Sequence, residues 1–190
     1  MKTEHRLAQA LKEMLAKVPL ESISVTSLSE RCDVSRKTFY YHFHDIYDLL
    51  TLVFLNEKID GIQSAKTPKD VLSKIYSYYQ KNSGFIDATI DSAGRDLFEE
   101  FIFNVCYQSF LRIINLSPES KQITLNEKKA IVRFYTAGFS YAIVFYLSNA
   151  KHKSLEGLNN ALSFLDNGFL QKAVDDLISN KYESEVVEKQ

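Results

Sequence analysis

Two adjacent cations, Arg36 and Lys37, begin a stretch of the chain whose polar side chains are all basic or neutral. No Asp or Glu occurs from Val34 to His44, although the chain carries 24 acidic residues and a formal net charge of -1. Arginine and lysine can donate hydrogen bonds to guanine in the major groove, and hydroxyl and imidazole groups suit phosphate oxygens. The chemistry open to this stretch is contact with DNA; the alternative is an ordinary solvated helix face.

The elements that position these cations are predicted to be short helices joined by a tight turn. An amphipathic helix over residues 3–17 is followed by helices over 25–32 and 36–42. The last two are joined at Asp33, a residue type that tolerates the left-handed conformation better than most. Two short helices joined in this way form a helix-turn-helix. A fourth helix is expected from Asp45 to about Gly61, as a direct link to the rest of the chain.

Capping residues support the start of each of these helices. Ser35 is expected to cap the 36–42 helix. For the 25–32 helix the sequence leaves three choices open, namely Ser24, Thr26, and a capping box made by Ser27 and Glu30.

One face of the 36–42 helix is predicted to anchor a small core. Phe39 and Phe43 are four residues apart and share a face, so that Arg36, Lys37 and Tyr40 lie on other faces of the same helix. The expected core members are Leu7, Leu11, Ile23, Leu28, Val34, Phe39 and Phe43.

Residues 4–52 resemble the N-terminal DNA-binding domain of TetR-family transcriptional regulators. The matching residues are Val34-Ser35, Thr38-Phe39-Tyr40, His42-Phe43 and Leu49-Leu50. The stretch TFYYHFHDIYDLL is further similar to the subgroup around the regulator of the dihydroxyacetone kinase operon. The resemblance implies an all-α fold with a helix-turn-helix head and a C-terminal helical bundle. It also implies a ligand-responsive repressor that binds a palindromic double-stranded DNA operator as a homodimer.

The resemblance also implies roles for individual residues. Four residues at the start of the recognition helix are expected to face base edges or nearby phosphates: Ser35, Arg36, Lys37 and Thr38. Three later residues are expected to lie toward the sugar-phosphate backbone: Tyr40, Tyr41 and His42. Ser24 and Thr26 are further phosphate candidates.

Three positions depart from the family pattern. Asp33 stands where glycine is usual, Lys37 where a small residue or proline is common, and Ile46 where a phosphate-contacting lysine is frequent. The loss of that lysine weakens non-specific affinity. It keeps open a second interpretation, in which a chain of the same fold acts mainly as a co-regulator through a protein partner.

The remainder of the chain is predicted to be helical. Helices are expected over 68–82, 94–116, 126–148 and 155–179, with a short apolar piece over 85–90 after a break at Ser83-Gly84. The predicted organisation is a DNA-binding domain over 1–50, a ligand-binding and dimerisation domain over 51–180, and a polar tail over 181–190.

Residues 131–147 are apolar nearly all the way round, more than a monomer of this size would cover, so a subunit interface is expected there. Gly138 and Ala142 permit close backbone approach. In TetR-like proteins the last two long helices pair with their mates in a four-helix interface, and an ordinary core is the alternative. The expected interface residues are Gly138, Ala142, Leu158, Leu162, Leu165 and Phe169.

The resemblance implies a small-molecule pocket in the aromatic-rich body, with plain core as the alternative for each residue. The expected lining is Phe98, Phe101, Ile102, Val105, Phe134, Tyr135 and Tyr141. No Arg or Lys lies between Phe134 and Leu147, so the expected effector is apolar or aromatic. By pressing on the 45–61 helix it would change the spacing of the two DNA-binding heads.

Other classes of function find little support. No G-x-S-x-G, P-loop or H-E-x-x-H motif occurs, so neither catalysis nor a catalytic residue is expected. No metal or cofactor is expected either, because His42 and His44 diverge on a helix and the cysteines fit no metal spacing. A redox sensor at Cys32 or Cys106 would lack a resolving partner nearby. Neither a signal peptide nor an apolar run of about 20 residues occurs, which favours the cytoplasm and no membrane contact.

Overall fold

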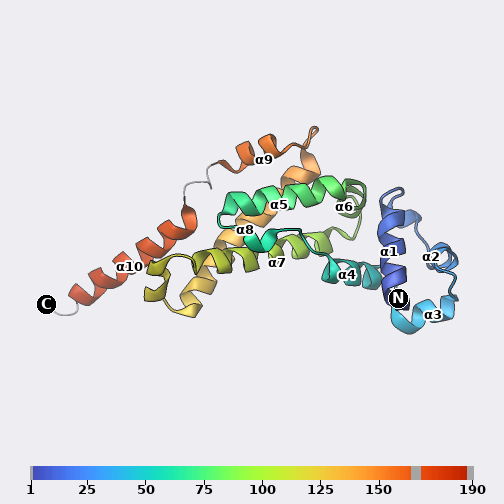
Figure 1. The fold of residues 1–190 in the computed structure, drawn as a ribbon, viewed down its shortest axis with the longest axis horizontal. Helices are drawn as coiled ribbons and strands as arrows, with labels where there is room; N and C mark the ends of the chain where they lie inside the picture. Colours follow the sequence, from blue (N-terminus) through green and yellow to red (C-terminus); the bar gives the residue numbers. More distant parts are fainter. Residues whose placement is uncertain (1, 164–167, 188–190) are drawn as a thin grey trace. The chain divides into compact units, whose positions relative to one another are not determined.

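The computed structural model describes residues 2–163 and 168–187, and within these ranges it contains helices and no strand (Figure 1). The predicted all-α fold is confirmed. The α-helices are α1 (Thr3–Leu15), α2 (Val25–Arg31), α3 (Arg36–His42), α4 (Ile46–Asn56), α5 (Pro68–Lys81), α6 (Ser83–Ile90), α7 (Arg95–Ile114), α8 (Leu125–Asn149), α9 (Leu155–Ala161) and α10 (Phe169–Val187). Short 3-10 turns are η1 (Leu20–Ser22), η2 (Ile62–Ser64) and η3 (Pro118–Gln122).

The chain forms two compact units. Unit 1 consists of Met1–Asp60 and Ser77–Phe101, and unit 2 of Gly61–Tyr76 and Ile102–Gln190. Helices α5 and α7 therefore each contribute residues to both units. The division by function into residues 1–50, 51–180 and 181–190 is a different partition and stays a prediction.

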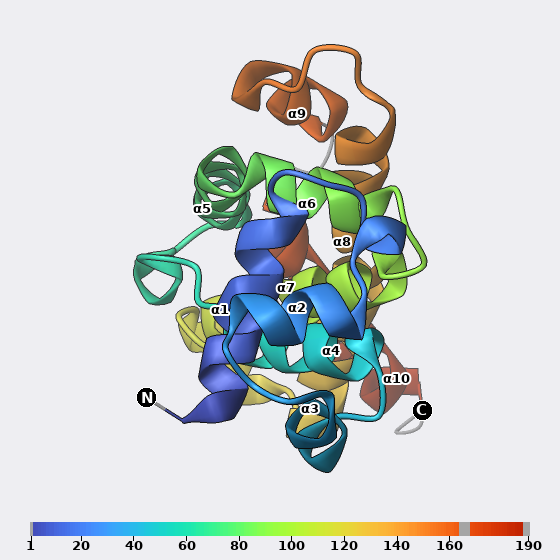
Figure 2. The same cartoon turned by 90° about the vertical axis from the view of Figure 1, so that its right-hand side faces the viewer.

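Unit 1 is organised around α1, which packs against α2, α4 and α6, while α2 packs against α3. In Figure 2, α2 lies in front of α1 and α3 lies below both. Six of the seven expected core residues are buried, and Val34 is partly exposed. Burial of these side chains from three helices supplies the apolar area that holds the short α2 and α3 in place, because helices of seven residues are marginal on their own.

The turn between α2 and α3 has the conformation that the sequence predicts. Asp33 has a φ of 49°, in the left-handed region, and the Val34 N–H donates to the carbonyl of Ser29 at 3.0 Å. The open choice of cap for α2 is settled in favour of Ser24, whose hydroxyl accepts from the N–H of Ser27 at 3.0 Å. Ser35 caps α3 as expected, accepting from the Thr38 N–H at 3.0 Å.

The fourth helix ends earlier than predicted. Helix α4 stops at Asn56, and Glu57 leaves the helix with a ψ of 140°. Its carboxylate lies 2.7 Å from the Lys12 ammonium of α1 and accepts from the Tyr78 hydroxyl at 2.6 Å. These partly buried bonds offset the loss of another helical turn. Burial and, to a lesser degree, the Glu57 carboxylate raise the pKa of the Tyr78 phenol, so that the hydroxyl stays a donor to this carboxylate.

A break was expected at Ser83-Gly84, but α6 begins at Ser83 and includes Gly84. The preceding helix ends instead at Lys81, and Asn82 adopts a φ of -126° and a ψ of 21° between α5 and α6. Gly84 serves the packing of α6 on α1 rather than a turn, because Ala16 approaches it closely.

Unit 2 is built on α8, which packs against α9 and α10, while α10 also packs against η3. The ring of Phe110 lies 5.0 Å from that of Phe139 and 5.7 Å from that of Phe169, measured between centroids. These three aromatic side chains, from α7, α8 and α10, form the centre of its core.

The single last helix predicted over residues 155–179 is instead two helices, α9 and α10. Gly168, directly before α10, has a φ of +69°, a left-handed conformation that interrupts a right-handed helix and that glycine adopts without strain. Helix α10 then continues to Val187, into the segment that was expected to be a polar tail.

Helix α8 is long and apolar enough to cross a membrane, judged by length and composition alone. Of its most apolar 18-residue window, 39% is buried, so a large part of that surface faces outward. Core helices of soluble proteins have the same composition, and composition therefore does not assign α8 to a membrane.

Candidate DNA-binding surface

The cationic start of α3 is exposed. Arg36 and Lys37 are the first two residues of this helix, and both side chains lie on the surface of unit 1. They follow Ser35, whose hydroxyl contacts that of Thr38 at 2.8 Å as well as capping the helix. A capped first turn fixes the direction in which α3 presents the two cations.

The second half of α3 divides its aromatic residues between core and surface. Phe39 is buried, and its ring meets that of Tyr40 edge-on, with 5.5 Å between centroids. Tyr40 is exposed, and Tyr41 exposes 84% of its area. Because both side chains are exposed, their phenol hydroxyls can donate hydrogen bonds to an anion.

His42 ends α3 and is only partly exposed. Its Nδ1 atom lies 3.2 Å from the Glu4 carboxylate at the start of α1. Sequence reasoning did not connect these two residues, because their contact depends on how α1 packs beside α3.

The two phosphate candidates on α2 differ in what their side chains already do. Ser24 and Thr26 are both exposed at the N-terminal end of the helix. The Ser24 hydroxyl takes part in the reciprocal capping box with Ser27. Thus unit 1 carries all nine predicted DNA-binding residues, on the start of α2 and along α3, and it leaves each at least partly exposed.

An arginine that sequence reasoning missed stabilises the turn. The guanidinium of Arg6 donates to the carbonyl of Cys32, the C-terminal cap of α2. The Arg31 guanidinium, at the end of α2, lies 2.8 Å from the Glu13 carboxylate of α1. Both contacts connect α1 with the end of α2, and so fix the position from which α3 begins. In the sequence, the only indication of this role was that Arg6 stands directly before Leu7, a residue predicted to be in the core.

The predicted interface residues do not share one environment. Leu158, Leu162 and Phe169 are buried within unit 2. Ala142 is partly exposed, whereas Gly138 is exposed and a Cβ added to it would meet nothing within 4 Å. Leu165 lies outside the described residues.

Helix α8 carries an exposed apolar stripe that runs through Gly138. Phe134 exposes 74% of its area, Tyr141 65% and Phe145 52%. With Gly138 they are spaced by four, three and four residues, which places all four on one face of the helix. This face presents large, mostly uncovered aromatic side chains around a glycine.

The residues predicted to line a pocket are likewise distributed. Phe98 and Phe101 are buried in unit 1, where their rings lie 6.0 Å and 5.5 Å from that of Phe54. In unit 2, Ile102 is buried, Val105 and Tyr135 are partly exposed, and Phe134 and Tyr141 lie on the exposed face of α8. The Tyr135 ring packs against Phe169, with 4.7 Å between centroids.

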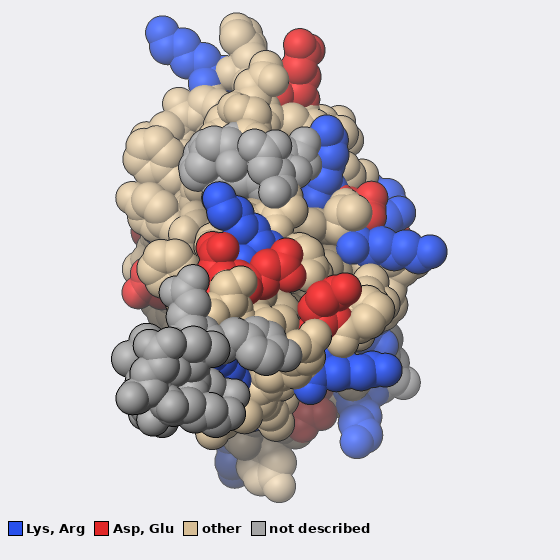
Figure 3. All heavy atoms as spheres, turned by 90° about the vertical axis from the view of Figure 1, so that its left-hand side faces the viewer, with Lys and Arg blue, Asp and Glu red and all other residues tan. Residues whose placement is uncertain are grey.

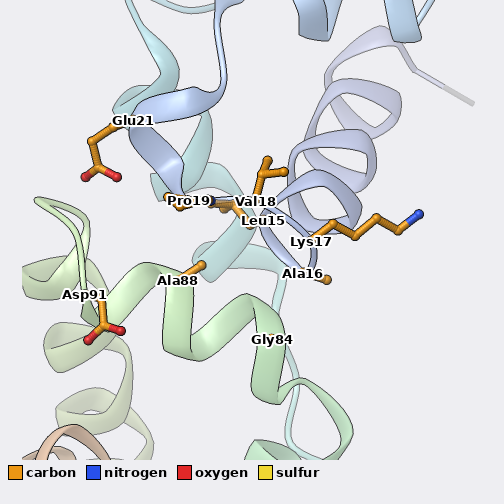
Figure 4. A pocket seen from close by; sticks show the side chains of 9 residues that line it. All are labelled: Leu15, Ala16, Lys17, Val18, Pro19, Glu21, Gly84, Ala88 and Asp91. Carbon is orange, nitrogen blue, oxygen red and sulfur yellow. The ribbon is translucent and has the colours of Figure 1, made fainter.

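Two open cavities in unit 1 are lined by other residues. One, of about 280 Å³, lies where the end of α1 and η1 approach α6 (Figure 4). Figure 4 shows Lys17 extending away from α6, with the carboxylates of Glu21 and Asp91 on the opposite side of the view. The other, of about 610 Å³, lies between the start of α4 and the start of α7 and includes Asp48 and Asp96. Acidic side chains take part in lining both cavities, and neither cavity includes a residue of the predicted pocket, which stays a prediction.

Figure 3 shows the side of unit 2 on which α10 lies. Acidic side chains lie near the centre of this view, and most of the Lys and Arg side chains lie toward its right-hand edge.

Neither cysteine has the properties of a reactive thiol. Cys32 and Cys106 are both buried and unpaired with each other. Burial raises the pKa of both thiols, and at Cys32 it outweighs the opposing effect of Arg6 and Arg31. The thiolate is the reactive form, so both groups are held away from it. Among the described residues no group of three or more His, Cys, Asp and Glu side chains is arranged to hold a metal.

The helix-turn-helix of unit 1, its exposed cationic helix and the all-helical unit 2 define the class of helical transcription regulators. A family model for the TetR type, described as "Transcriptional regulator C-terminal region", matches residues 66–168. The chain therefore belongs to the TetR family of transcriptional regulators. The matched region is the part where the sequence resemblance was weakest, since the motif residues all lie before residue 52.

Solved structures agree in fold. The chain is similar to the dihydroxyacetone kinase operon activator DhaS, with 20% identity, a TM-score of 0.61, and coverage of 91% of this chain and 96% of the other. It is also similar to the TetR family repressor AlkX from Dietzia sp. strain DQ12-45-1b, with 15% identity, a TM-score of 0.57, and coverage of 90% and 96%. A search of curated protein sequences finds no match.

Proposed function

We propose that the protein is a transcriptional repressor that binds an operator in double-stranded DNA through α3. The observation that carries the proposal is the exposed Arg36-Lys37 pair at the capped start of a helix whose neighbourhood, from Val34 to His44, has no acidic residue. Residues at the start of a recognition helix meet base edges in the major groove. Ser35 and Thr38 would share that role, and Ser24, Thr26, Tyr40, Tyr41 and His42 would contact phosphates.

The proposed active form is a homodimer. The exposed stripe of Phe134, Gly138, Tyr141 and Phe145 supports a contact between two copies of α8, because a large apolar face on one helix is costly to leave in water. Gly138 would let the two backbones approach closely. Leu158, Leu162 and Phe169 would act beneath this face, as the core that holds α8. A two-fold dimer would place its recognition helices about 34–36 Å apart, on an operator that is an inverted repeat.

An apolar or aromatic effector is proposed to control DNA binding. Support comes from the aromatic and aliphatic residues that α7 carries between Phe98 and Val105, where only two residues, Glu99 and Glu100, are charged and no cation occurs. By reciprocity, the effector must bind the DNA-competent and DNA-free forms with different affinity, typically by about 1–3 kcal/mol. No cofactor is proposed, and the protein is proposed to work in the cytoplasm.

A second candidate is a co-regulator of the same fold that acts through a protein partner. It is favoured by the start of α4, where Ile46 stands at the position of a cation in the family and is flanked in the sequence by Asp45 and Asp48. These carboxylates would repel a phosphate backbone and lower affinity for DNA. Of the two similar solved structures, one is named an activator and the other a repressor.

Selection from a random DNA pool tests the main proposal. The full-length protein is incubated with random duplexes, and bound molecules are amplified and sequenced over several rounds. The proposal requires an enriched inverted repeat whose affinity falls steeply as salt increases. No enrichment, together with capture of a partner protein that restores DNA binding, would support the co-regulator instead.

A further inference from the structure

His42 is held between α1 and the outer surface of unit 1. Its Nδ1 atom lies 3.2 Å from a Glu4 carboxylate oxygen, and the His42 and Glu4 side chains expose 22% and 40% of their areas. The Tyr41 ring meets the imidazole edge-on, with 5.0 Å between centroids. The carboxylate and the ring together restrict the orientation of the imidazole. With Nδ1 directed at Glu4, the other ring nitrogen, Nε2, remains for a ligand.

The hydrogen-bond inventory of the imidazole then limits what Nε2 can do. If Nδ1–H donates to the Glu4 carboxylate in a neutral ring, Nε2 is an acceptor. A phosphate oxygen is also an acceptor, so a neutral His42 in this orientation cannot bond to it. The doubly protonated ring can donate to Glu4 and to a phosphate at the same time.

The surroundings favour that doubly protonated form once DNA is bound. Glu4 supplies one negative charge, and a phosphate at Nε2 would supply a second. His42 is also the last residue of α3, where the helix dipole favours a cation. The flanking elements carry further charged and titratable groups. On α1 these are His5, Arg6, Lys12 and Glu13, and near the start of α4 they are His44, Asp45 and Asp48. The Asp45 carboxylate accepts from the Asp48 N–H as the cap of α4.

We infer that Glu4 is a positioning residue that holds His42 with Nε2 toward a DNA phosphate, so that DNA binding takes up a proton at His42. The inference rests on the proposed function, in which His42 faces the backbone. The balance is one proton, taken from the buffer, for each His42 that contacts a phosphate. Since the dimer would carry two such residues, two protons would be taken up for each operator.

The sign of the effect follows from the linkage of binding and protonation. Free histidine side chains titrate near pH 6.5. Well below that value histidine side chains are protonated, so the proposed phosphate contact is available in full. Binding that takes up a proton becomes weaker as pH rises, because fewer protons are available. Affinity for DNA should therefore decrease with pH through the neutral range, by at most about tenfold per pH unit for each linked proton.

The experiment measures DNA affinity from about pH 6 to about pH 8, the range in which histidine changes charge. The probe is a fluorescein-labelled duplex of mixed sequence at constant ionic strength, because a phosphate contact needs no particular sequence. The variants are His42→Gln, which offers a neutral amide donor, and Glu4→Gln, which removes the orienting charge. His5→Asn is the matched control on α1. Thermal unfolding followed by circular dichroism checks that each variant is folded.

Wild type and His5→Asn should lose affinity as pH rises, and His42→Gln should give a flatter profile. Glu4→Gln should bind less tightly at the acidic end and also take up fewer protons, as measured by calorimetry in buffers of different ionisation enthalpy. The inference is overturned if wild type binds DNA and the affinity of His42→Gln changes with pH as steeply as that of wild type. That outcome would leave the proposed DNA-binding function intact. If wild type binds neither this duplex nor a selected one at any pH, it is the proposed function that fails.

Discussion

The carbonyl oxygen of Ala16 lies where a side chain at Gly84 would begin. A Cβ added to Gly84 would be 2.8 Å from that oxygen and 3.3 Å from the Ala16 Cα. The end of α1 and the first turn of α6 therefore meet backbone against backbone within unit 1. Glycine inside a helix costs about 1 kcal/mol relative to alanine, and this close approach explains why it is present.

Gly84→Ala should lower the stability of the protein, because the atoms of Ala16 that the added Cβ would meet are backbone atoms, which cannot turn aside. The expected loss is about 1–3 kcal/mol, typical of overpacking. Urea unfolding measures it, with Ser83→Ala as the control at the neighbouring position. Equal or greater stability of Gly84→Ala would show that α1 and α6 are not packed this closely.

Asp33→Gly should raise stability. Asp33 has a φ of 49° and is exposed, so replacement removes the strain of a left-handed conformation and leaves the buried core unchanged. The expected gain is up to about 1 kcal/mol, since glycine is also the more flexible residue in the unfolded chain. Asp33→Ala is the matched comparison and should instead destabilise. The same melting temperature for glycine and alanine would contradict a strained turn.

Tyr141→Lys should weaken self-association. Tyr141 lies on the exposed stripe of α8, and a lysine there would place two charges in an apolar contact about a two-fold axis. Light scattering across a concentration series measures the dissociation constant. Leu116→Lys, at an exposed apolar position outside the stripe, should leave it unchanged. The proposed interface is wrong if both variants, or neither, dissociate.

Glu127→Gln should change how the stability of the protein depends on pH. The Lys181 ammonium, followed by the N–H and hydroxyl of Thr124, lowers the pKa of Glu127 from 4.5 to about 2. Because the folded value is lowered, the stabilisation is present above pH 4.5 and is lost as pH falls toward about 2. Wild type should therefore melt at higher temperature than Glu127→Gln near neutral pH, and the two should converge in strong acid. Glu100→Gln removes an exposed charge on α7 and should show no such convergence; a constant offset for Glu127→Gln would contradict the pairing with Lys181.

Local patterns in the sequence were enough to predict that the first four helices exist and where each begins. Helical periodicity and capping depend only on residues a few positions apart. The periodicity is seen at Leu7 and Leu11 and at Phe39 and Phe43, and the caps are Ser35 and Asp45. For the same reason, the nine DNA-binding candidates lie on the expected elements. The same local patterns did not predict where α4 ends or that residues 155–179 form two helices.

Contacts between distant segments could not be predicted from the sequence. Glu57 ends α4 because Lys12 and Tyr78 bind its carboxylate, and these residues are 45 and 21 positions away. Leu158 and Leu162 have the periodicity of an interface stripe, yet they are buried within unit 2, whereas Phe134 and Tyr141 face outward. Apolar periodicity shows that a face is covered, but it does not distinguish a neighbouring helix from a second subunit.

The central claim is that α3 reads DNA through Arg36 and Lys37, and the most direct test is the affinity of the Arg36→Ala/Lys37→Ala variant for the duplex selected by the wild-type protein. Lys151→Ala/Lys172→Ala removes two exposed cations of unit 2 and serves as the matched control for net charge. We expect the α3 variant to fold normally and to bind about fivefold to about 150-fold more weakly for each hydrogen-bonded guanine that it no longer reads, while the control binds like wild type. Unchanged affinity of the α3 variant at moderate salt would contradict the assignment of α3 as the recognition helix.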